Sequence, residues 1–418
     1  MARKTLFSAA ALLVLAACSS DEPVASSMVE NDAMGANPYR VSLTDALKNA
    51  DVLLSELDEA VATRSAQRKV QSVEYLSRSG TRALGGDTLL YLVNYADDAG
   101  FALLSADSRL RPIYAISDEG SLSLSDTTYN KGLALFARGV EAEIEASLTI
   151  PNDTAIFNPP TIPEEDDEVD MVKSVKDRVS PMLNVHQRNW DQGRPYNKYC
   201  PTIGSDTTIV GCVPIAVGQI MSYHKWPGMY GNVIFDWDEI NEGRDNDALA
   251  KFLRILGTPN FLNVNYGLTR TSASVSNAYT TFQKMRYTCH SRFVSFNEQD
   301  ACAFMKGVYS DSYVASPILV SGSYVGDDGH MWVLDGYIQY QYKTMTVPQV
   351  TEVDDVLYHC VWGWGGKNNG YYYWAKNQRF DNDIIMEDRD DNYEGNLSTF
   401  TYFYNITFMA GFMPPQGE

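Results

Sequence analysis

Residues 210–227, VGCVPIAVGQIMSYHKWP, predict an apolar helix that begins at a single cysteine. Gly211 permits a sharp entry into the helix. Pro214 falls in the first helical turn, where the N–H that proline lacks has no intrahelical partner to lose. Downstream positions form an apolar stripe that would anchor the helix in a core: Val213, Ala216, Val217, Ile220 and Met221.

Two interpretations of Cys212 follow from this position. The positive end of the helix macrodipole, together with a nearby imidazolium, lowers the pKa of a thiol and makes it a nucleophile. A buried cysteine is also a common small hydrophobic core residue. The position alone favours the core thiol, and the motifs described below favour the nucleophile.

The charge of the chain excludes one class of partner. The 418 residues carry 33 basic and 53 acidic side chains, a net charge of -20, and no local basic stripe. A nucleic acid phosphate backbone would be repelled by such a surface. The length is sufficient for two domains, each with its own core.

The first twenty residues, MARKTLFSAAALLVLAACSS, are typical of a secretory signal, with a basic start and a short apolar run. The ending Leu15-Ala16-Ala17-Cys18 resembles the lipobox of bacterial lipoproteins. That resemblance implies cleavage before Cys18 and lipidation of its thiol. Ordinary secretion with cleavage nearby is the alternative.

We therefore expect residues 1–17 to be a lipoprotein signal peptide and residues 18–38 a tether. The protein would be exported and held at the outer membrane or cell surface, and release of the mature domain stays open. The apolar run is too short for a permanent membrane span. The expected membrane contact is therefore the lipid at Cys18 alone.

The remaining cysteines predict neither a disulfide scaffold nor a metal site. Their number is odd and their spacing irregular, and no CxxC or HxxxH spacing occurs. We expect no structural metal and no cofactor. These cysteines are Cys200, Cys212, Cys289, Cys302 and Cys360.

Helical and strand patterns alternate in the first part of the chain. Residues 42–61 form an amphipathic helical pattern, and a second helical pattern covers residues 131–148. Between them, strand-like stretches occupy residues 88–95, 101–105 and 112–117.

Residues 151–170, PNDTAIFNPPTIPEEDDEVD, combine prolines with an acidic cluster and lack periodicity. They predict an exposed linker, open to proteolysis. The expected domains are thus residues 39–150, a linker at 151–172, and a larger domain at 173–418.

Four ordered motifs carry a family resemblance. The chain resembles, in order and spacing, the streptopain-like cysteine peptidases of the papain clan. The upstream stretch GFALLSADSRLRPIYAISDEG (100–120) resembles their inhibitory propeptide. The four motifs are VSPMLNVHQRNWDQGRPYNKYCP (179–201), GCVPIAVGQIMSYHKWP (211–227), DGHMWVLDGY (328–337) and HCVWGWGGKNNGYYY (359–373).

The resemblance implies an α+β fold. It consists of a papain-like catalytic domain with a helical half and an antiparallel sheet, preceded by a small and separate α+β propeptide domain. Residues 39–150 would inhibit the zymogen until the linker is cut. Protein or peptide substrates are the implied partners, with the chain's own propeptide as intramolecular inhibitor.

The same resemblance implies the site. Cys212 would be the nucleophile and His330 the base, on a strand edge that faces the thiol. Trp362 would shield the histidine from water, although a core aromatic is the plain alternative. Ser272 and Gly329 match substrate contacts of the family. We interpret His186, His224, His290 and His359 as structural.

Four positions depart from the family pattern. Val361 replaces an asparagine that orients the histidine, and Pro214 and Ile215 replace smaller, more polar residues. Asp206 stands six residues before the cysteine, where papain-like enzymes place a glutamine that donates to the oxyanion. These departures put activity in doubt.

Three functions therefore stay open at this point. The first is a cysteine endopeptidase, made as a zymogen and acting through an acyl-thioenzyme. The second is a catalytically weakened relative that serves as a peptide-binding or adhesion lipoprotein. The third is a papain-clan enzyme of another reaction, such as amide transfer.

Overall fold

The computed structural model describes residues 39–59, 68–77, 88–149, 171–290, 292–324, 329–346, 349–374 and 404–415. The expected signal peptide, tether and lipidated Cys18 lie outside the described residues, as does the acidic linker from 151 to 170. No helix in the described ranges is long and apolar enough to cross a membrane.

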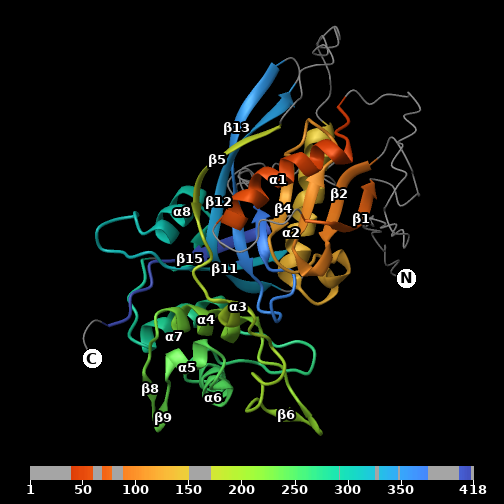
Figure 1. Ribbon diagram of the computed structural model, residues 1–418. Coiled ribbons are helices and arrows are strands. Elements are labelled where there is room, and N and C mark those ends of the chain that lie inside the picture. The colour runs from red at the N-terminus through yellow and green to blue at the C-terminus, as the bar shows by residue number, and fades with distance from the viewer. Residues whose placement is uncertain are drawn as a thin grey trace, which may run out of the picture.

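The N-terminal part, residues 39–149, folds as two helices against four strands (Figure 1). The helical and strand patterns expected from sequence are all confirmed within a few residues, and β1 is a strand that they missed. The elements are α1 (Leu43–Glu59), β1 (Val70–Ser77), β2 (Thr88–Tyr95), η1 (Ala96–Asp98), β3 (Phe101–Ser105), β4 (Ile113–Ser117), η2 (Leu124–Thr128) and α2 (Lys131–Thr149).

The C-terminal part, residues 171–415, combines a helical half with long strands. Its first strand begins inside the expected linker. The helical half contains α3 (Val185–Arg188), β6 (Thr202–Ile203), β7 (Asp206–Thr207), α4 (Cys212–Tyr223), β8 (Met229–Tyr230), β9 (Val233–Ile234), α5 (Trp237–Asn241), α6 (Asn246–Leu256) and α7 (Val275–Lys284). The sheet half contains β5 (Val172–Val179), β10 (Val294–Ser295), α8 (Glu298–Lys306), β11 (Ile318–Tyr324), β12 (His330–Thr346), β13 (Gln349–Val361), β14 (Gly370–Tyr373) and β15 (Tyr404–Met409).

One 11-stranded sheet joins the two parts, in the order β1-β2-β3-β4-β14-β13-β12-β11-β15-β10, with β5 also paired to β12. Its ladders are antiparallel, which confirms the expected α+β class. The N-terminal part is expected to be a separate domain, and in the structure it shares this sheet with the C-terminal part. Strand β4 pairs with β14, with Ile116 opposite Tyr371 and Ala115 opposite Tyr372.

The physical reason for this continuity is the edge of the C-terminal sheet. Without β4, strand β14 would expose a row of unpaired N–H and C=O groups. Gly370 packs closely on this neighbour, because a Cβ there would lie 2.9 Å from Cβ of Ser117 in β4. The N-terminal part therefore completes the sheet through main-chain hydrogen bonds.

Two hydrophobic clusters form the core, and the boundary between them differs from the boundary between the N-terminal and C-terminal parts of the sequence. The first joins Leu54 of α1 and Phe136 of α2 to sheet residues such as Trp332 and Tyr358. It therefore crosses the boundary between the two parts. The second surrounds α4, where Ile220 packs with Trp190, Leu253 and Met331.

A buried arginine also links the two parts. Arg111, which precedes β4, contacts Asp355 of β13 and forms a 2.8 Å ion pair with Glu143 of α2. Its guanidinium carbon lies 3.1 Å from the centre of the Tyr373 ring. The side chains of Arg111 and Asp355 are only 9% and 3% exposed, so each charge depends on its partners.

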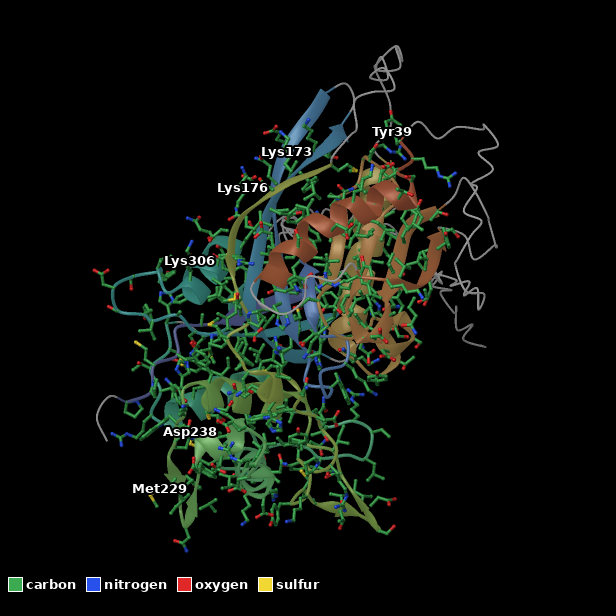
Figure 2. All side chains as sticks on the ribbon, viewed as in Figure 1. Tyr39, Lys173, Lys176, Met229, Asp238 and Lys306 are labelled. Atoms are coloured by element: carbon green, nitrogen blue, oxygen red, sulfur yellow. The ribbon has the colours of Figure 1, made fainter. Side chains whose placement is uncertain are left out.

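We expect Arg111→Ala to destabilise the full chain by about 3–5 kcal/mol, because it leaves two carboxylates without their buried cation. Denaturant unfolding of the full chain measures the change. Lys173→Ala is the matched control, since Lys173 of β5 forms a more exposed pair with Glu352 (Figure 2). The control should cost less than about 1 kcal/mol. Equal losses in the two variants would contradict a coupling role for Arg111.

Candidate active site

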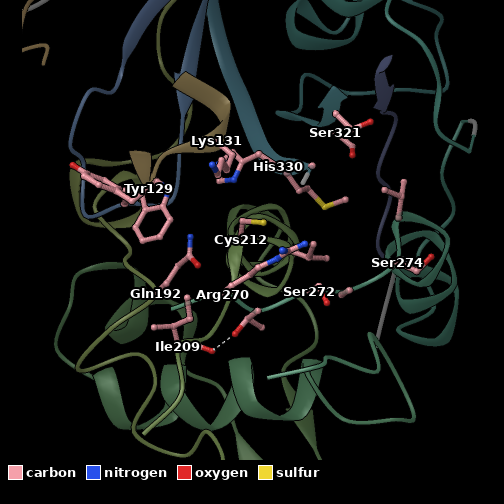
Figure 3. A pocket seen from close by; sticks show the side chains of 18 of the residues that line it. Tyr129, Lys131, Gln192, Ile209, Cys212, Arg270, Ser272, Ser274, Ser321 and His330 are labelled. Carbon is pink, nitrogen blue, oxygen red and sulfur yellow. Dashed lines mark hydrogen bonds between the residues drawn. The ribbon is translucent and has the colours of Figure 1, made fainter. Parts of the chain in front are cut away.

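A cavity of about 880 Å³ lies where the helical half, the sheet half and the N-terminal part meet (Figure 3). Cys212 and His330 both line it. Three segments supply most of its other walls: residues 269–275 before and at the start of α7, residues 329–331 at the start of β12, and residues 128–131 of the N-terminal part.

Cys212 is the first residue of α4, as expected. The turn before it requires glycine: Gly211 has φ 93°, and a Cβ there would lie 2.7 Å from Thr271 Cγ2. Burial raises the pKa of the Cys212 thiol. Backbone hydrogen bonds from Met331, Cys212 and Val213 act in the opposite direction. The Met331 contact places the sulfur beside the residue that follows His330.

His330 is the first residue of β12 and lies opposite Gly322 of β11. Its Nε2 lies 3.0 Å from the carbonyl oxygen of Trp362. A carbonyl only accepts hydrogen bonds, so Nε2 carries the proton and Nδ1 of the neutral ring keeps its lone pair. The ring also stacks on Trp332, at a centroid distance of 6.0 Å.

Burial lowers the pKa of His330 to about 4, against the hydrogen bond to the Trp362 carbonyl, which raises it. At neutral pH the imidazole is therefore uncharged. Because burial also raises the pKa of Cys212, the thiol is protonated in the same state. The unprocessed chain holds a neutral pair rather than a thiolate–imidazolium pair.

Val361 does not orient the histidine, and the structure shows what does. Val361 is fully buried in β13, where it pairs with Val333. The main-chain carbonyl of the next residue, Trp362, accepts from His330 in place of an asparagine amide. Sequence comparison of side chains could not reveal this, because every residue carries a carbonyl.

Trp362 is buried beside the histidine, with ring centroids 6.4 Å apart. Its indole N–H donates to the Asn368 carbonyl at 2.8 Å, and its backbone N–H donates to the side chain of Asn369 at 3.1 Å. These contacts hold the tryptophan ring beside His330.

Asp206 lies away from the site in the structure, whereas Gln192 lies in it. Asp206 lies exposed on the β6–β7 hairpin and is not among the residues that line the cavity. Gln192 lines the cavity, with its amide nitrogen 3.5 Å from the Gly363 carbonyl. The position six residues before Cys212 is Asp206 rather than this glutamine, because the β6–β7 hairpin is inserted between Gln192 and Cys212.

Ser272 and Gly329 both line the cavity. Ser272 belongs to the loop before α7, where its backbone pairs with Asn265. Gly329 directly precedes His330 and β12. Four of the five residues expected near the chemistry thus line the cavity. The fifth, Trp362, does not line it but lies beside the histidine.

Two of the other histidines have clear structural partners. His359 Nδ1 lies 2.6 Å from the buried carboxylate of Asp335, which also accepts from the backbone N–H of Leu183 at 3.1 Å. His224 Nε2 lies 3.0 Å from Ser316 Oγ. The five cysteines of the described ranges carry free thiols. Within those ranges, no group of three or more His, Cys, Asp or Glu is placed to hold a metal ion.

The N-terminal part closes the cavity at α2. A Cβ on Gly132 would lie 2.4 Å from two ring carbons of Trp362 and 2.8 Å from Cδ2 of His330. The ring of Tyr129 contacts that of Trp364, with centroids 5.4 Å apart. Only a residue without a side chain allows α2 to begin this close to the imidazole.

We expect iodoacetamide to alkylate Cys212 of the unprocessed chain more slowly than free cysteine at pH 7. The pKa of the thiol lies above its ordinary value, so the rate should still rise as the pH passes roughly 8.5. Mass spectrometry after timed alkylation gives the pH profile, and Cys212→Ala reports labelling of the other cysteines. A Cys212 rate that levels off below about pH 7 would indicate an ion pair and contradict the neutral state.

Comparisons with known proteins find two matching families and several relatives. Residues 190–372 match the Peptidase C10 family, and residues 38–144 match the Spi protease inhibitor family. The thiol protease/hemagglutinin PrtT of Porphyromonas gingivalis is 23% identical over 325 residues, which cover 69% of this chain and 34% of PrtT. Streptopain of Streptococcus pyogenes is 22% identical over 369 residues, covering 77% of this chain and 82% of streptopain.

This chain therefore spans about a third of the length of PrtT. Two solved structures from Prevotella intermedia are also similar. A prointerpain A fragment has a TM-score of 0.48 at 17% identity, covering 84% of this chain and all of that one. Active interpain A has a TM-score of 0.35 at 21% identity, covering 47% and 86%. By its two family matches, the chain combines a segment similar to the Peptidase C10 family with an N-terminal segment similar to the Spi protease inhibitor family, and it thus resembles the streptopain-like cysteine peptidases that carry a propeptide.

Proposed function

We propose that this protein is an exported cysteine endopeptidase made as a zymogen. One observation carries the proposal. Cys212, at the first turn of α4, and His330, at the start of β12, line the same cavity, and the Trp362 carbonyl holds His330 with Nδ1 unprotonated. A nucleophile and a base in one water-excluding cleft are the minimum for acyl transfer.

In the proposed reaction, His330 Nδ1 takes the thiol proton as Cys212 Sγ attacks the peptide carbonyl. The C–N bond then breaks, and the imidazolium gives the proton to the leaving amine. Water, deprotonated by the same nitrogen, attacks the thioester and releases the acid with the thiol restored. The backbone N–H of Cys212 and the Gln192 amide are the proposed donors to the oxyanion.

Substrate positioning is assigned to Ser272 and Gly329. Both line the cavity that Cys212 lines, so a peptide bound there could contact them. Gly329 offers its backbone without a side chain in the way. These roles rest on the family resemblance and on the shared cavity.

Residues 39–150 are the proposed inhibitor. The start of α2 contacts the histidine and its shielding tryptophan, and Tyr129 and Lys131 occupy the cavity wall. These residues take up part of the wall beside Cys212 and His330, where a substrate would bind. We further propose that the linker 151–170 is cut during activation, and that lipidation of Cys18 anchors the exported chain.

The binding-protein alternative loses two of its supporting observations. The carbonyl of Trp362 supplies the contact that Val361 cannot make, and the carboxylate of Asp206 lies outside the cavity. Amide transfer uses the same cysteine and histidine. Product analysis with an added amine therefore separates transfer from hydrolysis.

The central test uses the full chain under reducing conditions. We expect the wild-type chain to cleave itself within 151–170 and then to hydrolyse peptides. Cys212→Ala should not process itself but should be cut by the processed wild type. His330→Ala should lower kcat by at least about 10³-fold, and Gln192→Ala by roughly 10²-fold, with Gln283→Ala as the exposed control. Self-processing of Cys212→Ala, or a wild type inert toward every peptide and thiol-directed inhibitor, would contradict the proposal.

Latency should depend on Gly132. Gly132→Ala forces a methyl group into Trp362 and His330, so we expect α2 to shift and the full chain to process several-fold faster. Gly228→Ala is the matched control, because a Cβ at Gly228 meets nothing within 4 Å. Timed gels of linker cleavage give the rates. An unchanged rate in Gly132→Ala would show that this contact does not maintain latency.

A further inference from the structure

The charge inside the cavity is opposite to that of the chain. Among the described residues that line it, the side chains with a fixed charge are Lys131 and Arg270, both positive, and no aspartate or glutamate is present. The whole chain has a net charge of -20. His330 adds no charge at neutral pH, because burial lowers its pKa to about 4.

Only one of these two cations belongs to the peptidase. Lys131 begins α2 of the propeptide, so it leaves the cavity when the propeptide leaves. Arg270 lies in the loop between α6 and α7 and stays. In Figure 3 its side chain extends from this loop into the cavity that contains Cys212.

The loop that carries Arg270 is fixed to the turn that precedes Cys212. Thr271 Oγ1 donates to the Ile209 carbonyl at 3.0 Å and accepts from the Gly267 N–H at 3.2 Å. The methyl group of Thr271 is the atom that a Cβ on Gly211 would strike. Arg270 is thus held at a constant place relative to Cys212, although its own side chain is exposed.

A guanidinium in this position can bind a carboxylate of the substrate. It presents five N–H donors, so a contact within the chain leaves donors for a second partner. Serine and threonine hydroxyls at Thr269, Ser272 and Ser274 surround it in the cavity wall, and none of them competes as an anion. The surrounding negative chain would otherwise repel an acidic peptide.

We propose that Arg270 makes this peptidase selective for substrates with aspartate or glutamate close to the scissile bond. The inference rests on the proposed endopeptidase function and names its substrate class. The chain carries such a segment itself, since residues 163–170 read PEEDDEVD within the expected processing region. The Arg270 side chain therefore acts both on acidic protein substrates and on the chain's own linker.

The experiment compares matched peptides. Processed enzyme obtained from the full chain is given fluorogenic peptides that carry glutamate or glutamine at each position within three residues of the cleaved bond. We expect at least one position at which kcat/KM for glutamate exceeds that for glutamine by about fivefold, the value of a partly exposed ion pair. The preference should decrease with added salt.

Substitutions of Arg270 test whether this arginine causes the preference for glutamate. Arg270→Gln should reduce the glutamate-to-glutamine ratio to about one, Arg270→Glu should invert it, and Arg270→Lys should retain part of it. Arg244→Gln is the control for net charge, since Arg244 is exposed, pairs with Glu239 and does not line the cavity. Its ratio should equal that of the wild type.

The chain itself provides a second substrate. The Cys212→Ala full chain is offered to processed wild type with its linker native or with the acidic residues of 163–170 changed to amides. Native linker should be cut several-fold faster, and the difference should vanish with Arg270→Gln enzyme. Hydrolysis of glutamine peptides with no glutamate preference at any position would overturn the role of Arg270 and leave the peptidase proposal intact. Absence of both turnover and labelling by peptidyl thiol-directed inhibitors would overturn both.

Discussion

The packing of helix α4 on strand β12 is the constraint on which this structure depends. Ile220 and the other apolar residues of α4 share one core with Met331 and Val333, so the first residue of the helix meets the first residues of the strand. The backbone contact from Met331 to Cys212 fixes that junction. A thiol and an imidazole more than a hundred residues apart in sequence become neighbours because two element ends coincide.

Strand β12 is held from several sides. Strands β11, β13 and β5 all pair with it, and β13 leads directly into Trp362, whose carbonyl holds His330. A one-residue slip of β12 would turn the His330 side chain to the other face of the sheet, away from the Trp362 carbonyl. Because a main-chain oxygen holds the imidazole, the geometry proposed for catalysis depends on sheet pairing rather than on one side chain.

The propeptide shares the sheet and the core of the peptidase, in addition to covering its cleft. Strand β4 pairs with β14, one hydrophobic cluster includes both parts, and Arg111 joins buried carboxylates from each. Burial also keeps the Cys212 thiol protonated and the His330 imidazole neutral, because both charged forms lose hydration there. The start of α2 lies against this imidazole, at Gly132.

The sequence by itself determined the local elements and the chemistry that they carry. Gly211 and Pro214 mark the start of α4, short apolar runs bounded by turn residues mark β2 and β3, and the ordered motifs indicate Cys212 and His330, because each signal lies within a few residues. The tertiary structure is needed to see that Gln192 lines the cavity while Asp206 does not. It is also needed to see that the Trp362 carbonyl replaces the amide missing at Val361. It alone decided that β4 continues the peptidase sheet and that Arg270 faces Cys212. Strand pairing and loop placement depend on contacts between distant segments, and backbone groups are identical at every residue, so no residue pattern encodes them locally.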